Sequence, residues 1–181
     1  MDAGVARLVT TPRAMRDPVR LPAMPAGWAM TVTDERVVRA PLRTMFALAR
    51  DVDRWPEHLA HYRWVRFVSR DELGGGLVAM SASRLFGPVA WPTWWTSEMA
   101  VDDARPAIRF RHVQGITRGM EVEWSFVEQR DGVHVRIVHS WNGPTWPLIG
   151  VTVARHVIGP VFIHGIASRT LAGLAAVAER R

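Results

Sequence analysis

Three polar side chains lie on strand-like runs whose faces are otherwise apolar. Residues 91–101, 107–114 and 133–141 alternate as strands do, and their apolar faces carry Ser97, His112 and His139, respectively. An imidazole titrates near neutral pH, so His112 and His139 are suited to general acid or base chemistry such as enolisation or dehydration. The alternative, that each histidine is a core or edge residue with one hydrogen bond, stays open.

The residues around these three predict a cavity for an apolar ligand. Nine Trp against one Tyr and six Phe favour a large aromatic core or an aromatic-lined pocket. Ligand pockets combine apolar walls with a few placed polar groups, and the same faces supply both. We therefore predict that the ligand contacts Trp55, Trp95, Ser97, Met99, Phe110, Met120, Trp124, Ile137, Trp141 and Ile163.

The composition argues against several other classes of site. The sequence contains no Cys, and His112 and His139 share no face with an acidic residue, so no metal site is expected. No nucleotide or haem motif is visible, and no cofactor is expected. All 23 basic residues are Arg, and they are scattered among apolar residues. A nucleic-acid-binding face would cluster them, so we expect no nucleic-acid partner despite the net charge of +6.

The chain divides into a leader and one domain. Residues 1–28 contain Pro12, Pro18, Pro22 and Pro25 with four Arg and no sustained periodicity, which predicts a flexible Arg/Pro-rich leader. An alternative is that the natural start is Met30. Residues 29–181 have the length of a single ligand-cavity domain. Charged and proline residues interrupt the N-terminus, so it is no secretory signal, and we expect a cytoplasmic protein.

The order of the predicted elements indicates an α+β fold. A strand over 31–39 is followed by a helix that Ala40-Pro41 opens and by a second short helix from Trp55 to about His61. Six more strand-like runs follow, at 64–70, 77–85, 91–101, 107–114, 119–128 and 133–141, and residues 161–181 have helical spacing. One turn every 8–14 residues favours an antiparallel meander. We therefore predict a seven-stranded antiparallel sheet wrapped around a long C-terminal helix.

This order, together with two short motifs, resembles a known superfamily. Val38-Arg39-Ala40-Pro41 and, further on, Trp55-Pro56-Glu57 are similar to the START-like superfamily, closest to its polyketide cyclase/dehydrase and lipid-transport branch with the helix-grip fold. The resemblance covers roughly residues 30–180 and implies an apolar ligand held between the sheet and the long helix. Members of this branch cyclise and aromatise polyketides, or carry lipids or quinones. The resemblance also implies a catalytic role for Tyr62, because a Tyr follows the Trp-Pro-Glu motif in the aromatase/cyclases.

One position departs from the aromatase/cyclase pattern. On the fourth strand those proteins have aromatic residues followed by Ser-Glu-Arg, whereas this chain reads Trp94-Trp95-Thr96-Ser97-Glu98-Met99. Met99 therefore replaces an implicated Arg, which speaks against aromatase chemistry, although Arg84 is an alternative source of the cation. The expected function is binding of an apolar polycyclic, polyketide-like or lipid ligand. A cyclase or dehydratase using Tyr62, His139 and His112 is one form of it, and a non-catalytic lipid or quinone carrier or ligand sensor is the other.

Two further segments allow alternative interpretations. Residues 148–166 are almost wholly apolar, but Gly159-Pro160 would break a spanning helix, so we predict a wall of the cavity there. Transient contact with an anionic membrane, aided by the Arg-rich leader, is the alternative. Glu121 and Glu123 share one strand face, and we predict that this face is solvated. The sequence gives no indication of the oligomeric state.

Overall fold

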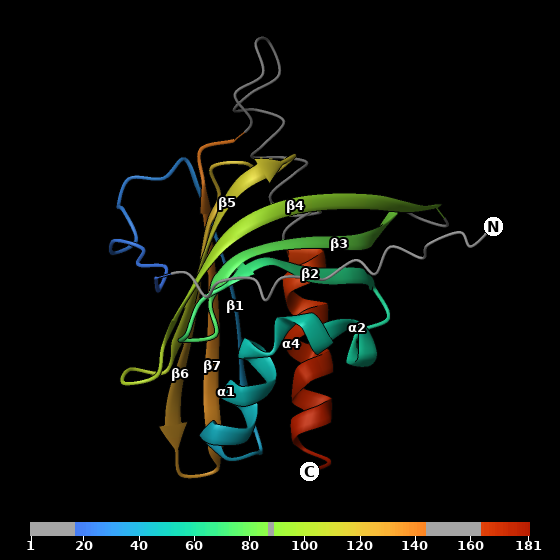
Figure 1. Ribbon diagram of the computed structural model, residues 1–181. Helices are drawn as coiled ribbons and strands as arrows, with labels where there is room; N and C mark the ends of the chain where they lie inside the picture. Colours follow the sequence, from blue (N-terminus) through green and yellow to red (C-terminus); the bar gives the residue numbers. More distant parts are fainter. Residues whose placement is uncertain (1–16, 87–88, 144–163) are drawn as a thin grey trace, which may run out of the picture.

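The computed structural model describes residues 17–86, 89–143 and 164–181, and Figure 1 shows its architecture. A first strand is followed by short helices, six strands and a C-terminal helix, which confirms the predicted order. The elements are β1 (Met30–Val38), α1 (Leu42–Arg50), the 3-10 helix η1 (Val52–Arg54), α2 (Trp55–His58), β2 (Tyr62–Arg70), β3 (Gly76–Phe86), β4 (Val89–Asp102), β5 (Ala107–Gly115), β6 (Glu121–Gln129), β7 (Gly132–Trp141) and α4 (His164–Ala178).

The seven strands form one antiparallel sheet in the order β1-β7-β6-β5-β4-β3-β2. Strands β2 to β7 are a meander of neighbours, and β1 closes the far side by pairing with β7, with Met30 opposite Trp141. The sheet curves, and α4, α1 and α2 all lie on its inner side (Figure 1). The structure therefore has the predicted helix-grip fold, in which the sheet wraps the C-terminal helix.

The two short helices pack on the core through their buried side chains. Helix α1 follows Pro41 and buries the stripe Met45, Phe46, Leu48 and Ala49. Helix α2 was predicted to reach about His61, but it ends at His58 because Leu59 takes an extended backbone. The buried side chain of Leu59 packs against Gly173 of α4 so closely that a Cβ at Gly173 would overlap Leu59 Cδ2. Leu59, directly after α2, thus contacts α4, and β2 begins three residues later at Tyr62.

Residues 17–29 contact strand β5 and the residues that directly follow β2 and β7. The Val19 N–H donates to Asp71 Oδ2 at 2.9 Å, and Arg109 Nη1 donates to the Pro22 carbonyl at 2.6 Å. The Ala29 N–H donates to Asn142 Oδ1 at 2.9 Å. Residues 1–16 of the predicted leader lie outside the described residues, and the boundary after residue 28 stays a prediction. No helix in the described part of the chain is long and apolar enough to cross a membrane.

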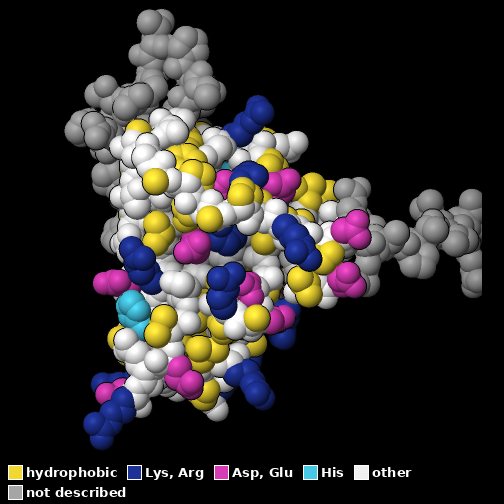
Figure 2. All heavy atoms as spheres, turned by 90° about the vertical axis from the view of Figure 1, so that its left-hand side faces the viewer, with side chains coloured by type: hydrophobic (Ala, Val, Ile, Leu, Met, Phe, Trp, Pro, Cys, Tyr) yellow, Lys and Arg dark blue, Asp and Glu magenta, His cyan; other side chains and the backbone are white. Residues whose placement is uncertain are grey.

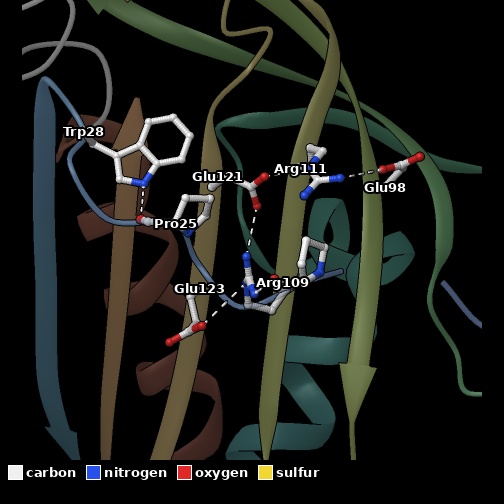
Figure 3. Close-up of polar contacts among 8 residues, drawn as sticks. Pro25, Trp28, Glu98, Arg109, Arg111, Glu121 and Glu123 are labelled. Atoms are coloured by element: carbon white, nitrogen blue, oxygen red, sulfur yellow. Dashed lines mark hydrogen bonds and ion pairs between the residues drawn. The ribbon is translucent and has the colours of Figure 1, made fainter. Parts of the chain in front are cut away.

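The outer face of the sheet contains a buried cluster of charges. Glu121 was predicted to be solvated, but it is only 4% exposed. Its carboxylate accepts from Arg109 Nη2 at 3.0 Å and from Arg111 Nε at 2.6 Å, and Arg109 also faces Glu123 (Figure 3). The Pro22 carbonyl bonds the same Arg109, so residues 17–29 help to cover the cluster. Basic and acidic side chains are interspersed over this side of the molecule (Figure 2).

Candidate functional site

A cavity lies between the inner face of the sheet and α4. It holds about 570 Å³ of space free of atoms, counting the part that opens to solvent. Every strand from β2 to β7 contributes to its wall, together with α2, α4 and the turn between β5 and β6. The lining residues are Trp55, Tyr62, Met80, Trp95, Phe110, His112, Thr117, Met120, Val122, Trp124, His139, Ile166, Ala167 and Thr170.

The structure brings eight of the residues singled out from the sequence to this cavity. Strand alternation turns the predicted faces inward, as on β6, where Val122 and Trp124 line the cavity while Glu121 and Glu123 point outward. The three candidate catalytic residues are among the eight. The set comprises Tyr62, His112, His139, Trp55, Trp95, Phe110, Met120 and Trp124.

Four other predicted ligand contacts are in the core instead. Ser97, Met99, Ile137 and Trp141 are each at most 1% exposed, and none of them lines the cavity. Trp141 Nε1 donates to the Arg118 carbonyl at 3.0 Å, so its polar atom is satisfied away from the ligand. The fifth, Ile163, lies outside the described residues.

Met99, which stands where the resemblance to the aromatase/cyclases implies an Arg, is buried in this chain. Met99 is fully buried and pairs with Phe110 across β4 and β5. Ser97 follows a bulge in β4 and pairs with His112, and its buried Oγ has no hydrogen-bond partner among the described residues. Met99 therefore puts no charge near the ligand, and the Arg84 side chain lies outside the described part of the structure.

Aromatic rings form a continuous wall along the cavity. The ring of Trp55 packs edge-on against that of Tyr62, with the ring centroids 5.2 Å apart, and its centroid lies 5.8 Å from that of Trp124. Tyr62 lies 6.3 Å from Trp95, which is stacked on His112 at 5.9 Å with an interplanar angle of 12°. Trp55 Nε1 donates to a backbone carbonyl at 3.1 Å, so its polar atom is satisfied. Such a wall suits a flat apolar ligand, because aromatic faces offer large contact area at low entropy cost.

Polar groups from α4, from the start of β2 and from the residue before β2 meet at one end of the wall. Thr170 is 1% exposed, and its Oγ1 lies 3.1 Å from His61 Nε2 and 3.4 Å from the Tyr62 hydroxyl. The Thr170 hydroxyl also donates to the Ile166 carbonyl at 2.8 Å. The sequence indicated His61 only as one of a pair, with His58, that is either solvated or at the rim of a pocket, and it did not single out Thr170 as a site residue. The signal available for Thr170 was a threonine within the apolar stripe of the C-terminal helix.

A second group of polar residues lies where β5 turns into β6. His112 Nδ1 and Thr117 Oγ1 are 2.6 Å apart, and the two side chains are 9% and 2% exposed. His139 of β7 also lines the cavity and pairs with Val122 in the sheet. Thr117 was not predicted, because a threonine in a turn carries no mark of burial in the sequence.

We expect His61 to make stability depend on pH between about 4 and 6.5. Burial, and next the charge of Arg169, lower the pKa of His61 to about 4. In this window the unfolded chain binds a proton that the folded chain does not, so stability falls as the pH falls through it. The side chain is only half-buried, so we expect a loss of about 1 kcal/mol, well below the value of the full shift.

Urea unfolding of the wild type and of His61→Gln at pH 6.5 and 4.5 measures this loss. The wild type should lose about 1 kcal/mol more than the variant between the two pH values. The other titrating groups are common to both proteins and cancel in the comparison. Equal losses in the two proteins would show that His61 is not responsible.

Comparisons with known proteins agree on the family. The family model for polyketide cyclase/dehydrase and lipid transport matches residues 38–157. The protein TTHA0849 from Thermus thermophilus has a TM-score of 0.66 at 20% identity, covering 81% of this chain and 95% of its own. The Zhui aromatase/cyclase from Streptomyces sp. R1128 has a TM-score of 0.66 at 18% identity, covering 84% and 94%.

A START superfamily protein from Mycobacterium smegmatis is also similar, with a TM-score of 0.59 at 18% identity, covering 83% of this chain and 95% of that one. No curated protein sequence matches the chain. Identities this low support the fold, whereas the family model spans about two thirds of the chain. The chain therefore belongs to the polyketide cyclase/dehydrase and lipid transport family of the START-like superfamily.

Proposed function

We propose that the protein binds an apolar, polycyclic or polyketide-like molecule between the sheet and α4 and acts on it as a cyclase or dehydrase. The observation that carries this proposal is one cavity that joins an aromatic wall to three groups able to move protons, Tyr62, His112 and His139. Cyclisation of a reactive poly-β-keto chain needs mainly an enforced conformation and exclusion of water, so a few such groups suffice.

The proposed chemistry assigns proton transfers to these groups. The imidazole of His139, or of His112, removes a proton from a carbon between two carbonyls, and the resulting enolate attacks a third carbonyl of the same chain. The Tyr62 hydroxyl protonates the alkoxide that forms. A proton then passes from the imidazolium to the Tyr62 tyrosinate, which restores both groups. In the dehydration step the imidazole removes a neighbouring proton, and the Tyr62 hydroxyl protonates the departing hydroxyl so that it leaves as water. The aromatic rings hold the chain in the folded shape that this attack requires.

A non-catalytic lipid or quinone carrier, or a ligand sensor, is the second candidate. The observation that favours it is that none of the described residues lining the cavity is Arg, Asp or Glu. Met99, which stands where the resemblance to the aromatase/cyclases implies an Arg, is buried in the core and carries no charge. Transient membrane contact stays a prediction, because residues 148–163 of the apolar segment lie outside the described residues.

His139→Ala separates the enzyme from the carrier. With a poly-β-keto thioester as substrate, we expect turnover to fall about 100-fold or more while the affinity for the substrate stays within about threefold. Product absorbance measures turnover, and native mass spectrometry measures binding and also detects any co-purified ligand. Trp94→Ala, which changes an exposed residue on the outer face, should alter neither value.

Two other results would contradict a catalytic role for His139. Binding without turnover in the wild type would favour the carrier. Equal loss of binding and turnover in His139→Ala would assign His139 to packing, and catalysis would then fall to His112 and Tyr62, tested by His112→Ala and Tyr62→Phe with the same assays.

A further inference from the structure

The two polar regions of the cavity are built alike, each from one histidine and one threonine. In the first, which we call the α4 end, Thr170 lines the cavity and His61 supports it from behind at 3.1 Å. In the second, the β5 end, His112 and Thr117 both line the cavity and lie 2.6 Å apart. Both threonines are at most 2% exposed, so neither hydroxyl is a surface group.

The hydrogen-bond count at the α4 end leaves Thr170 as an acceptor. A threonine hydroxyl has one hydrogen and two lone pairs. Its hydrogen goes to the Ile166 carbonyl at 2.8 Å, which can only accept. His61 must then donate its Nε2–H to Thr170, and burial supports this by holding the pKa of His61 near 4 and the ring neutral. The Tyr62 hydroxyl lies 3.4 Å from Thr170 Oγ1, farther than the Ile166 carbonyl, and Thr170 lines the cavity with a second lone pair that can accept. The α4 end therefore suits a ligand hydroxyl.

At the β5 end the threonine holds the imidazole in place. The bond between His112 Nδ1 and Thr117 Oγ1 is short, and the ring is stacked on Trp95 with the planes 12° from parallel. Two restraints at right angles to each other, one in the ring plane and one across its face, leave the imidazole little freedom. A positioned imidazole and hydroxyl at this end suit a ligand oxygen, either a hydroxyl or a carbonyl.

The aromatic wall sets the distance between the two ends. The ring centroids of Tyr62 and Trp95 are 6.3 Å apart, and those of Trp95 and His112 are 5.9 Å apart. The rings of Tyr62 and His112 are therefore at most about 12 Å apart. One ring or two fused rings with an oxygen at each end fit within this limit.

We propose that Thr170, backed by His61, and Thr117, paired with His112, are specificity-determining residues that select a flat ligand with an oxygen at both ends. The proposal rests on the proposed function, because it assumes that the cavity binds a ligand. A lipid with a single polar head can bond to only one of the two ends, so the proposal predicts that such a lipid binds more weakly than a ligand with two oxygens.

Three probes of graded polarity test the proposal: naphthalene, 2-naphthol and 2,6-naphthalenediol, measured by equilibrium dialysis. We expect the dissociation constant to fall with each added hydroxyl, by about 2- to 12-fold per step. Thr170→Val and Thr117→Val keep the side-chain shape. Each should cancel the gain in affinity from one of the diol's two hydroxyls, while the dissociation constant of naphthalene stays within about twofold of the wild-type value. Thr170→Ser and Thr117→Ser restore a hydroxyl and should restore the step.

The outcomes separate this proposal from the proposed function. If none of the three probes binds to the wild type, the cavity is not a ligand site and the proposed function fails. If naphthalene binds and the diol binds no more tightly, the proposed function stands and the two polar ends do not select the ligand. A Val variant that weakens naphthalene and the diol equally would reduce that threonine to a structural role. The wild-type series needs no variant, so it decides the matter even if a variant fails to fold.

Discussion

We expect the substitution Glu121→Gln to lower the free energy of unfolding by about 3 kcal/mol. The Glu121 side chain is 5% exposed and that of Arg109 is 11% exposed, so both charges are largely removed from water. Glutamine has almost the same shape but no charge, and it leaves Arg109 buried without its strongest partner. Breaking a buried ion pair from one side is costly because the remaining charge is neither solvated nor paired.

Glu123→Gln is the matched control on the same strand and the same face. The Glu123 side chain is 38% exposed and lies 3.5 Å from Arg109 Nε, so its loss should cost less than about 1 kcal/mol. Urea unfolding at neutral pH measures both variants. Similar losses in the two variants, or a Glu121→Gln protein as stable as the wild type, would show that burial does not set the strength of this cluster.

Trp124→Ala is expected to lower the free energy of unfolding by about 4 kcal/mol and to abolish binding of naphthalene. The indole is 4% exposed, lies 5.8 Å from the ring of Trp55 and 6.4 Å from that of Phe126, and lines the cavity. Its removal takes away a large buried area and opens a void that the rigid sheet cannot close. The same void removes the aromatic face on which the ligand lies.

Trp94→Ala provides the control for Trp124→Ala with the same chemical change. Trp94 is on the outer face and 54% exposed, so its loss should cost less than about 1 kcal/mol and leave naphthalene binding unchanged. Chemical unfolding and equilibrium dialysis give the two values. Trp124→Phe, a milder change, serves if the alanine variant does not fold, and it should weaken binding several-fold. Wild-type affinity in a folded Trp124 variant would place the ligand elsewhere.

The faces of the strands could be predicted from the sequence because alternation is a local property. Once Trp124 is assigned inward, its neighbours at two-residue spacing follow it, and the structure puts Met120, Val122 and Trp124 together on the cavity wall. The same rule brought His112 and His139 to the cavity from separate strands. Turn signals between the runs were enough to order β2 to β7, since consecutive strands there are antiparallel neighbours, whereas the place of β1 beside β7 was not predicted.

Depth within a face could not be predicted in the same way. Ser97, Met99 and Ile137 share the inward faces but are buried in the core outside the cavity, because curvature and the bulge before Ser97 decide where space remains. Glu121 was correctly assigned outward and wrongly taken as solvated, because its burial depends on Arg109 of the neighbouring strand and on residues 17–29, whose Pro22 carbonyl bonds the same Arg109.

Local patterns were sufficient to predict the order of the elements, the fold, the inward faces and the family, because periodicities and short motifs are carried by a few consecutive residues. Which inward residues meet the cavity, and which polar groups support them, depended on how the sheet and the helices pack. His61 and Thr170 are 109 positions apart, and Leu59 meets Gly173 across a similar separation. Contacts of this kind arise when the curved sheet closes on α4, so no local pattern records them.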